Sequence, residues 1–332
     1  MTWFQVLTGF HETSPSQVRE NITVDGNKLT SAVNGKVFTF GKLETPSLAE
    51  LRDRVRSCAH TTGRISVHEV VGNVMDLHVK RTNAGSLFQV ASQFNLLEMV
   101  SPSVTPESGV GIYENDHTQG PTCAIACGAG TIYRNYFASV NGQTGQSAGN
   151  QIDCLADIGI ELNNSGNRLW EMKNGYVLPT PEGLIEISNR LGKSNETELD
   201  KYRQLLRIGI QWNTQVTMME SKHTVTQTYC SALPVAYTNH SADLWELFAR
   251  LILEASYEAT ICTAILNSLY TGNNRVFLTL LGGGAFGNQD DWITDGIRRA
   301  LDLYKNWDLD IAIVSYGQSK KFVRQLIDQF ST

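Results

Sequence analysis

The stretch Val276–Ile297, "VFLTLLGGGAFGNQDDWITDGI", predicts a strand, a loop and a helix in succession. Its first part is a continuous apolar run, which is typical of a strand that is covered on both faces. Three glycines, Gly282–Gly284, end this run, and Phe286 follows in the loop. From Asp290 onward, apolar residues recur at helical spacing. A glycine-rich loop at this place presents backbone N–H groups that can hold an anion.

The same loop has a simpler interpretation as a turn. A glycine run alone is more often a tight turn that needs positive φ. The loop is not a Walker A motif, because no Gly-Lys-Ser/Thr follows, and no G-x-G-x-x-G opens a βαβ unit here. Phe286 separates the two interpretations, because an aromatic ring on a flexible loop is costly to expose unless it covers a partner such as a base or a ribose.

The last third of the chain alternates helices with buried strands. A long helical pattern begins at the N-cap Ser241, runs through Leu269 and is stopped by Gly272. Strands are expected at Arg275–Leu281 and Asp308–Tyr316, each followed by an amphipathic helix. This order predicts a three-layer α/β fold, with a mixed sheet flanked by helices.

The earlier segments add strands to this core. We expect residues 1–61 to form a strand-rich N-terminal extension that packs on a core of residues 62–332. A strand pair, or a strand and a turn, is expected around Gly72, and a helix from Pro121. Residues 170–235 contain a hairpin with an Asn-Gly turn and further strands, and these could extend the sheet or form an inserted lobe.

Composition limits the function classes. The 332 residues are 41% hydrophobic, with a net charge of −6 and a pI near 5.7, which argues against broad nucleic-acid binding. No apolar run approaches the ~20 residues of a membrane span, and the N-terminus does not resemble a signal peptide. The six cysteines are scattered, so we expect reduced thiols in a cytoplasmic protein, with no metal site and no cofactor.

Two polar segments are candidates for chemistry. The strand in Gln89–Glu98, "QVASQFNLLE", has Asn95 at its exit, where ligands bind in α/β sheets. Asn95 could equally be a loop residue that bonds its own backbone, and Glu98 could be a general base or a solvated acid. The loop Gly111–Pro121, "GIYENDHTQGP", places Asp116 and other polar residues before a helix N-terminus, either for acid–base work or as a capped surface loop.

Together these segments resemble a macrodomain, the ADP-ribose-binding fold. "VVGNV" around Asn73 is similar to the family's early Gly-Asp-Ile strand, although an asparagine replaces the acid that contacts adenine. "VASQFNLLE" is similar to the Asn-Ala-Ala-Asn strand exit, and "TLLGGGAFGN" to the second ligand loop. The family's glycine-rich first loop is replaced by "PESGVGIYENDHTQGP", and residues 170–235 have no counterpart. The chain is similar in kind to the bacterial-effector ADP-ribosylhydrolases that remove ADP-ribose from arginine.

The resemblance and the acid-rich loop at residues 114–119 together predict a site. Asp116, Glu98 and Asn95 would serve catalysis, with Asn95 orienting a ribose hydroxyl and Phe286 covering the distal ribose. The expected ligand-binding residues are Asn73, Gln119, Gly120, Gly282, Gly283, Gly284, Ala285, Phe286, Gly287 and Asn288.

Three functions follow from these observations. The first is an ADP-ribosylhydrolase that cleaves mono-ADP-ribose from protein side chains, arginine among them, at the anomeric carbon of the distal ribose. The second is a reader that binds ADP-ribose without chemistry, and the third is an interaction scaffold. The expected partner is ADP-ribose or an ADP-ribosylated protein, with no nucleic acid and no membrane insertion. The expected location is cytoplasmic, or a host cell if the protein is an effector.

Overall fold

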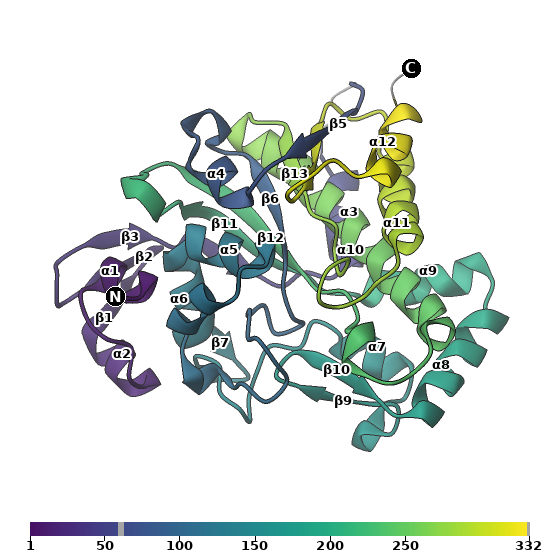
Figure 1. The fold of residues 1–332 in the computed structure, drawn as a ribbon, viewed down its shortest axis with the longest axis horizontal. Helices are drawn as coiled ribbons and strands as arrows, with labels where there is room; N and C mark the ends of the chain where they lie inside the picture. Colours follow the sequence, from purple (N-terminus) through teal and green to yellow (C-terminus); the bar gives the residue numbers. More distant parts are fainter. Residues whose placement is uncertain (59–62, 331–332) are drawn as a thin grey trace.

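A seven-stranded sheet runs through the computed structural model, which describes residues 1–58 and 63–330 (Figure 1). The strand order is β4-β11-β12-β6-β13-β14-β5. The five strands from β12 to β5 are parallel, whereas β4 and β11 pair antiparallel at one edge. The strands are β4 (Lys42–Glu44), β5 (Ser66–Val71), β6 (Leu87–Ala91), β11 (Gly209–Gln215), β12 (Thr224–Cys230), β13 (Arg275–Leu278) and β14 (Asp310–Ser315).

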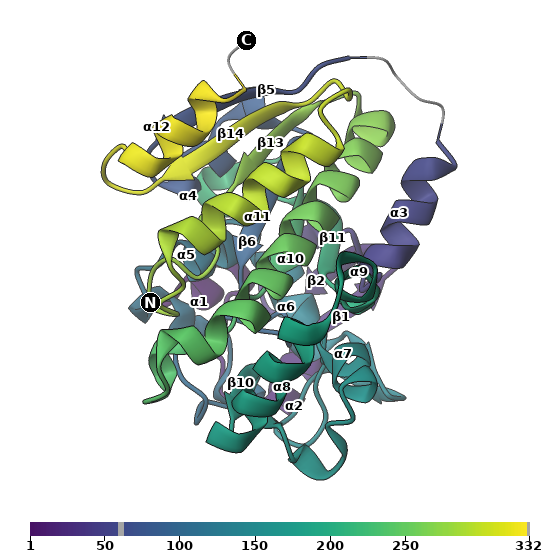
Figure 2. The same cartoon turned by 90° about the vertical axis from the view of Figure 1, so that its right-hand side faces the viewer.

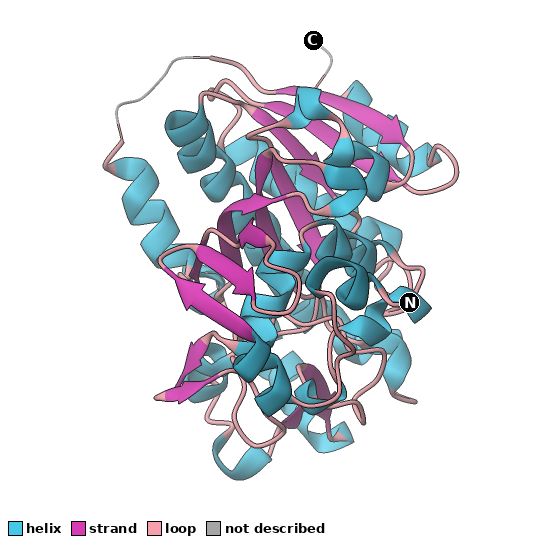
Figure 3. Ribbon diagram, turned by 90° about the vertical axis from the view of Figure 1, so that its left-hand side faces the viewer, coloured by secondary structure: helices cyan, strands magenta, loops and turns pink. Residues whose placement is uncertain are grey.

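Helices cover both faces of the sheet. One face carries α10, which packs against β6, β12 and β13, together with α11 and α12 (Figure 2). The other face carries α4, α5 and α6, so that the strands form a middle layer between helices (Figure 3). The predicted α/β class, a mixed sheet flanked by helices, is therefore confirmed. These helices are α4 (Val74–Val79), α5 (Gln119–Ala126), α6 (Gly128–Tyr136), α10 (Ala242–Thr271), α11 (Asp290–Leu303) and α12 (Lys321–Asp328).

The predicted helix after Ser241 is confirmed as α10, and its sequence explains both its length and its position. Ser241 is its N-cap, and Gly272 ends it with a φ of 75° in the left-handed region. Most residues from Trp245 to Ile265 are buried, because α10 packs against the sheet on one side and against other helices around it. These neighbours include α3 (Leu48–Arg56), α8 (Pro181–Lys193) and α9 (Glu196–Leu205).

The middle and N-terminal segments both contribute to the sheet. β11 and β12 lie within residues 170–235, whereas the hairpin of β9 (Trp170–Lys173) and β10 (Tyr176–Pro179) forms a separate small sheet. Asn174 and Gly175 form the predicted turn, with φ values of 49° and 81°. Residues 139–144 form a short pair, β7 and β8, and α7 (Ala156–Glu161) follows. The expected boundary between residues 61 and 62 lies outside the described residues.

The N-terminal segment is less strand-rich than predicted. It opens with two short helices, α1 (Trp3–Thr8) and α2 (Pro15–Asn21), whose N-caps Thr2 and Ser14 accept backbone hydrogen bonds. The small sheet of β1 (Ile22–Asp25), β2 (Lys28–Ser31) and β3 (Val37–Thr39) follows. The side chains of this segment share a second hydrophobic cluster with α5, α6 and the loop before α5.

Two predicted elements differ from the structure. After Gly72 the chain forms helix α4 rather than a second strand, because the Asn73 side chain accepts a hydrogen bond from the N–H of Met75 at 2.9 Å. The helix predicted from Pro121 breaks at Cys127 into α5 and α6. Thr217 stabilises the break, because it bonds the Ala126 carbonyl and the Gly128 N–H. No helix in the described part of the chain is long and apolar enough to cross a membrane.

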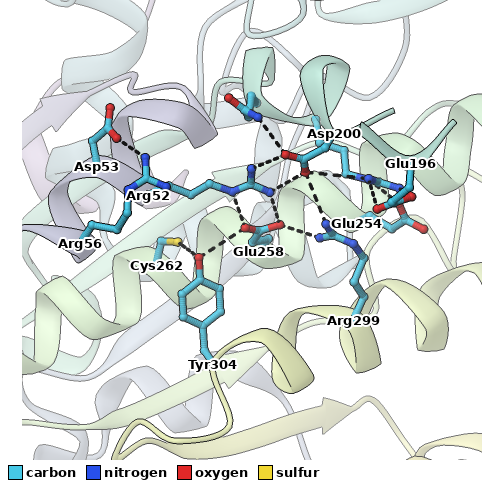
Figure 4. A network of polar contacts seen from close by, with 12 residues as sticks. Arg52, Asp53, Arg56, Glu196, Asp200, Glu254, Glu258, Cys262, Arg299 and Tyr304 are labelled. Carbon is cyan, nitrogen blue, oxygen red and sulfur yellow. Dashed lines mark hydrogen bonds and ion pairs between the residues drawn. The ribbon is translucent and has the colours of Figure 1, made fainter. Parts of the chain in front are cut away.

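A buried ion network ties α3, α9, α10 and α11 together (Figure 4). Glu258 of α10 is 1% exposed and accepts hydrogen bonds from Arg52 of α3 and Arg299 of α11, each at 2.5 Å. Arg52 also forms a two-pronged pair with Asp200 of α9. Burial raises the pKa of Glu258, but the bonds from Arg52 and Arg299 outweigh it, so the net pKa is lowered. Glu258 is therefore held as a carboxylate.

We predict that Glu258→Ala lowers the free energy of unfolding by about 3–5 kcal/mol, because it leaves the Arg52 and Arg299 guanidinium groups with only the partly exposed Asp200 as a counter-charge. Urea denaturation followed by circular dichroism measures this change. The control is Glu186→Ala, which removes a carboxylate from the exposed pair with Arg168 and should leave stability almost unchanged. Equal losses in the two variants would contradict the prediction.

Candidate functional site

A cleft of about 630 Å³ opens at the carboxyl ends of the parallel strands. Segments that follow β6, β12, β13 and β14 line it, as does the N-terminus of α5. Ligands of open α/β sheets bind in this position, because loops from several strands converge there. The predicted site residues that line the cleft are Glu98, Asp116, Gln119, Gly120, Gly282, Gly283, Gly284, Ala285 and Phe286.

Glu98 is a buried carboxyl group at the cleft. It is only 4% exposed, yet it belongs to the lining. Its Oε1 is buried and has no hydrogen-bond partner among the described residues. Burial raises the pKa of Glu98 well above its usual range; the Arg134 guanidinium opposes this, and the Asp116 carboxylate adds to it. Burial therefore favours the protonated form of Glu98, which is not a solvated surface acid.

The turn before Glu98 contains Asn95, one of the predicted catalytic residues. Asn95 is fully buried and does not line the cleft. Its Oδ1 accepts the N–H of Leu97 at 3.1 Å, and its Nδ2 donates to Gln151 at 2.8 Å. Both of its polar atoms are thus bonded within the protein. The structure therefore does not support Asn95 as a ribose ligand and gives it the loop role that the sequence left open.

The N-terminus of α5 lies beside Glu98. A Cβ at Gly120 would lie 2.2 Å from the Ala91 carbonyl oxygen and 2.7 Å from Oε2 of Glu98, so only glycine allows this close approach. Asp116 lies just before the helix and accepts the N–H of Thr118 at 2.9 Å. The Nε2 of Gln119 is buried without a hydrogen-bond partner among the described residues. The first N–H groups of any helix lack intrahelical acceptors, so this end of α5 favours an anionic ligand.

The glycine loop forms the opposite side of the cleft. Gly282 has a φ of 72°, and a Cβ there would lie 2.6 Å from the Ala232 side chain. The N–H groups of Gly284, Ala285 and Phe286 bond no acceptor within the described chain, whereas that of Gly283 bonds the Leu280 carbonyl. Three successive N–H groups of this loop are therefore free to bind an anion.

Gly287 and Asn288 shape this loop but do not line the cleft. Gly287 has a φ of 72° and donates its N–H to the Gly284 carbonyl at 3.1 Å. The side chain of Asn288 is buried and donates to the Leu233 carbonyl at 2.8 Å, and its N–H bonds the Gly282 carbonyl. The structure thus gives both residues a part in closing the loop and no access to a ligand in the cleft.

An aromatic cluster forms one wall of the cleft. Phe286 packs against Tyr176 and Tyr237, with ring centroids 5.5 Å apart in each case. Tyr176 comes from the hairpin strand β10 and is fixed by its hydroxyl, which donates to the Met99 carbonyl at 2.7 Å. Neither Tyr176 nor Tyr237 is among the residues predicted from the sequence. The Asn-Gly turn placed Tyr176 on a hairpin, but nothing in the sequence showed which element that hairpin faces.

Asn73 follows β5, the strand next to β14, and is a further predicted ligand residue outside the cleft lining. Its side chain is occupied as the N-cap of α4. The cleft lining instead includes Tyr316 and Lys320, from the segment after β14. This segment is held by Glu69, whose carboxylate accepts bonds from Ser315, Ser319 and the Lys320 N–H.

The charges of the cleft are uneven. Glu98, Asp116 and Asp290 contribute carboxyl groups, and Lys320 is the one Lys or Arg among the described residues of the lining. Within the described residues, no group of three or more His, Cys, Asp or Glu side chains is placed to hold a metal ion. An anionic ligand would therefore be held mainly by backbone N–H groups, and the three carboxyl groups of the lining favour a cationic group.

We predict that Gly282→Ala lowers stability and that Gly284→Ala does not. Alanine at position 282 must adopt a positive φ, and its Cβ meets the Ala232 side chain. The free energy of unfolding should therefore fall by about 1–2 kcal/mol. Gly284 has open space where a Cβ would lie and no positive φ, so its variant should keep wild-type stability. Urea denaturation of the two proteins checks this, and a larger loss at Gly284 would contradict it.

Comparisons with known proteins give structural similarities only. No family model and no curated protein matches the chain. A poly(ADP-ribose) glycohydrolase from Thermomonospora curvata is similar with a TM-score of 0.47 and 11% identity, over 95% of this chain and 97% of that one. The corresponding enzyme from Deinococcus radiodurans, in complex with ADP-ribose, has a TM-score of 0.45 and 11% identity, over 87% and 94%. Similarities below a TM-score of 0.5 do not establish an activity.

Proposed function

We propose that this chain is an ADP-ribosylhydrolase that releases ADP-ribose from modified protein side chains. The observation that carries the proposal is Glu98, a buried carboxyl group with a raised pKa that lies in a cleft lined by free backbone N–H groups. A module that only binds ADP-ribose needs the N–H groups and the aromatic wall. It does not need a protonated acid. Burying the Glu98 carboxyl group without a partner for Oε1 lowers the stability of the protein, so a function for this group is expected.

The ligand is proposed to lie in the cleft, across the carboxyl ends of the parallel strands. The free N–H groups of Gly284, Ala285 and Phe286, opposite the N-terminus of α5, would hold the diphosphate. The ring of Phe286 would cover the distal ribose, backed by Tyr176 and Tyr237. The distal ribose would then lie on the side of Glu98, and the adenosine would lie toward Tyr316 and Lys320.

The proposed chemistry uses two carboxyl groups in different states. Glu98 in its acid form donates a proton to the side-chain nitrogen or oxygen that leaves the anomeric carbon. Asp116 as a carboxylate accepts a proton from a water molecule, whose oxygen forms the new bond to that carbon. The glycosidic bond breaks, and free ADP-ribose and the unmodified side chain leave. The environments match these roles, because Glu98 is buried and Asp116 is partly exposed.

The side chain we propose as the substrate is arginine. Asp116 and Asp290 line the cleft, and the one Lys or Arg among its described lining residues is Lys320. A guanidinium group attached to the distal ribose would meet these carboxylates and gain favourable electrostatic energy. A modified glutamate or aspartate would gain no such energy. Arginine-linked substrates should therefore be cleaved faster than carboxylate-linked ones.

We predict that Glu98→Gln lowers the rate of ADP-ribose release from mono-ADP-ribosylated arginine by about 10²–10⁴-fold, because glutamine cannot donate a proton to the leaving group. Asp116→Asn should also lose activity. ADP-ribose binding, measured by calorimetry, should persist in both variants. Glu107→Gln is the control, since Glu107 is an exposed acid outside the cleft lining. Full turnover in both Glu98→Gln and Asp116→Asn would contradict the mechanism, and binding by the wild type without any release would favour the reader.

We further predict the sign of the pH dependence. A general acid works only while protonated, so kcat should fall as the pH rises through the raised pKa of Glu98. Because the Asp116 carboxylate helps to raise this pKa, Asp116→Asn should shift the titration of Glu98 to lower pH. Carbon-13 NMR of labelled glutamate carboxyls measures that shift without relying on activity. A Glu98 titration near that of exposed glutamates would contradict this prediction.

A further inference from the structure

Tyr113 contacts the backbone of both proposed catalytic acids from behind the cleft. It is 1% exposed and does not belong to the cleft lining. Its hydroxyl oxygen accepts the N–H of Glu98 at 3.0 Å. Its carbonyl oxygen accepts the N–H of Asp116 at 3.1 Å. Glu98 and Asp116 come from different loops, and this one residue bonds the main chain of both.

The segment that carries Tyr113 is itself anchored by the N-terminus of the protein. The carboxylate of Glu12 accepts the N–H groups of Val110 at 3.0 Å and Gly111 at 2.6 Å. It also accepts the hydroxyl of Tyr136 at 2.6 Å. A Cβ at Gly109 would lie 2.5 Å from the Glu12 carboxylate, so the loop leaves room for this side chain. Glu12 therefore fixes the start of the 3-10 turn Gly111–Asn115.

Two further contacts from the same N-terminal segment hold this turn. The N–H of Trp3 donates to Glu114 at 3.0 Å, and the Trp3 indole donates to the Val110 carbonyl at 3.1 Å. Phe4 and Phe10 pack with Tyr113 in the second hydrophobic cluster. The N-terminal segment thus binds the outer side of the turn, while Tyr113 points inward to Glu98. A contiguous path of contacts leads from Glu12 to both acids.

We propose that Tyr113 is a positioning residue that sets the two carboxyl groups relative to each other, with Glu12 as its anchor. This inference rests on the proposed hydrolase function. An acid and a base that act on opposite sides of one bond must be held within a narrow range, because a misplacement of about 1 Å can cost ~10²-fold in rate. Tyr113 supplies this constraint without touching the ligand, since it lies outside the cleft lining.

The test compares Tyr113→Phe with Tyr304→Phe. Tyr113→Phe removes the acceptor of the Glu98 N–H and keeps the ring, so kcat should fall between about 10- and 100-fold with little change in KM. Tyr304→Phe is the matched control. It removes a largely buried hydroxyl that contacts Cys262 and Glu258 and lies outside the cleft lining, and kcat should stay at the wild-type value. Glu12→Gln keeps the volume of the anchor but cannot accept all three bonds, so it should lower kcat as well.

A second readout separates this inference from the proposed function. Amide hydrogen exchange of Glu98 should be at least about tenfold faster in Tyr113→Phe than in the wild type, and unchanged in Tyr304→Phe. If the wild type releases ADP-ribose and Tyr113→Phe retains full kcat, the inference is overturned. If the wild type releases none, the proposed function fails. Amide hydrogen exchange still tests the positioning role in that case. Faster exchange at Glu98 in Tyr113→Phe supports Tyr113 as the residue that holds the Glu98 backbone, and unchanged exchange overturns that role.

Discussion

Leu96 adopts a φ of 65° in the interior of the protein, and the proposed site depends on the contacts that hold it there. A left-handed conformation costs a residue with a Cβ roughly 1–2 kcal/mol. The chain offsets this cost with specific bonds. The N–H of Leu96 donates to the Gln93 carbonyl at 2.9 Å, and its carbonyl accepts Nε of Arg134 at 3.1 Å. The tight reversal returns the chain to the end of β6, which places Glu98 at the cleft. A straight continuation of the strand would carry that acid away from the glycine loop.

The charges beneath the site follow from the same turn. Arg134 is 1% exposed and has no carboxylate within salt-bridge distance among the described residues. Its guanidinium lies 3.6 Å from the centre of the Tyr229 ring and bonds the Leu96 carbonyl and Thr131. It therefore stabilises the turn and partly offsets the burial that raises the pKa of Glu98. Glu258 differs from Glu98, because this buried carboxylate forms ion pairs with two arginines and remains charged.

Local patterns predicted the elements well where the interaction is short-range. The stop at Gly272 and the Asn174–Gly175 turn both form as expected, because each depends on neighbouring residues only. Asn73 and Asn95, which were predicted as site residues, instead bond within the protein and lie outside the cleft lining. An asparagine at a strand exit can face a ligand or bond nearby backbone, and the choice depends on partners such as Met75 and Gln151.

The sequence by itself determined that the chain is an α/β protein with a strand, a glycine loop and a helix at Val276–Ile297. These features depend on apolar periodicity and on the conformational freedom of glycine, which are local properties. Tertiary structure alone decided that Glu98 is buried beside Gly120 and that Tyr176 stands against Phe286. It also decided that Tyr113 bonds the backbone of both acids. A side chain becomes buried and takes its position relative to other loops only when segments distant in sequence pack together. The pKa of a catalytic acid depends on that burial, and its reach to the substrate depends on that position.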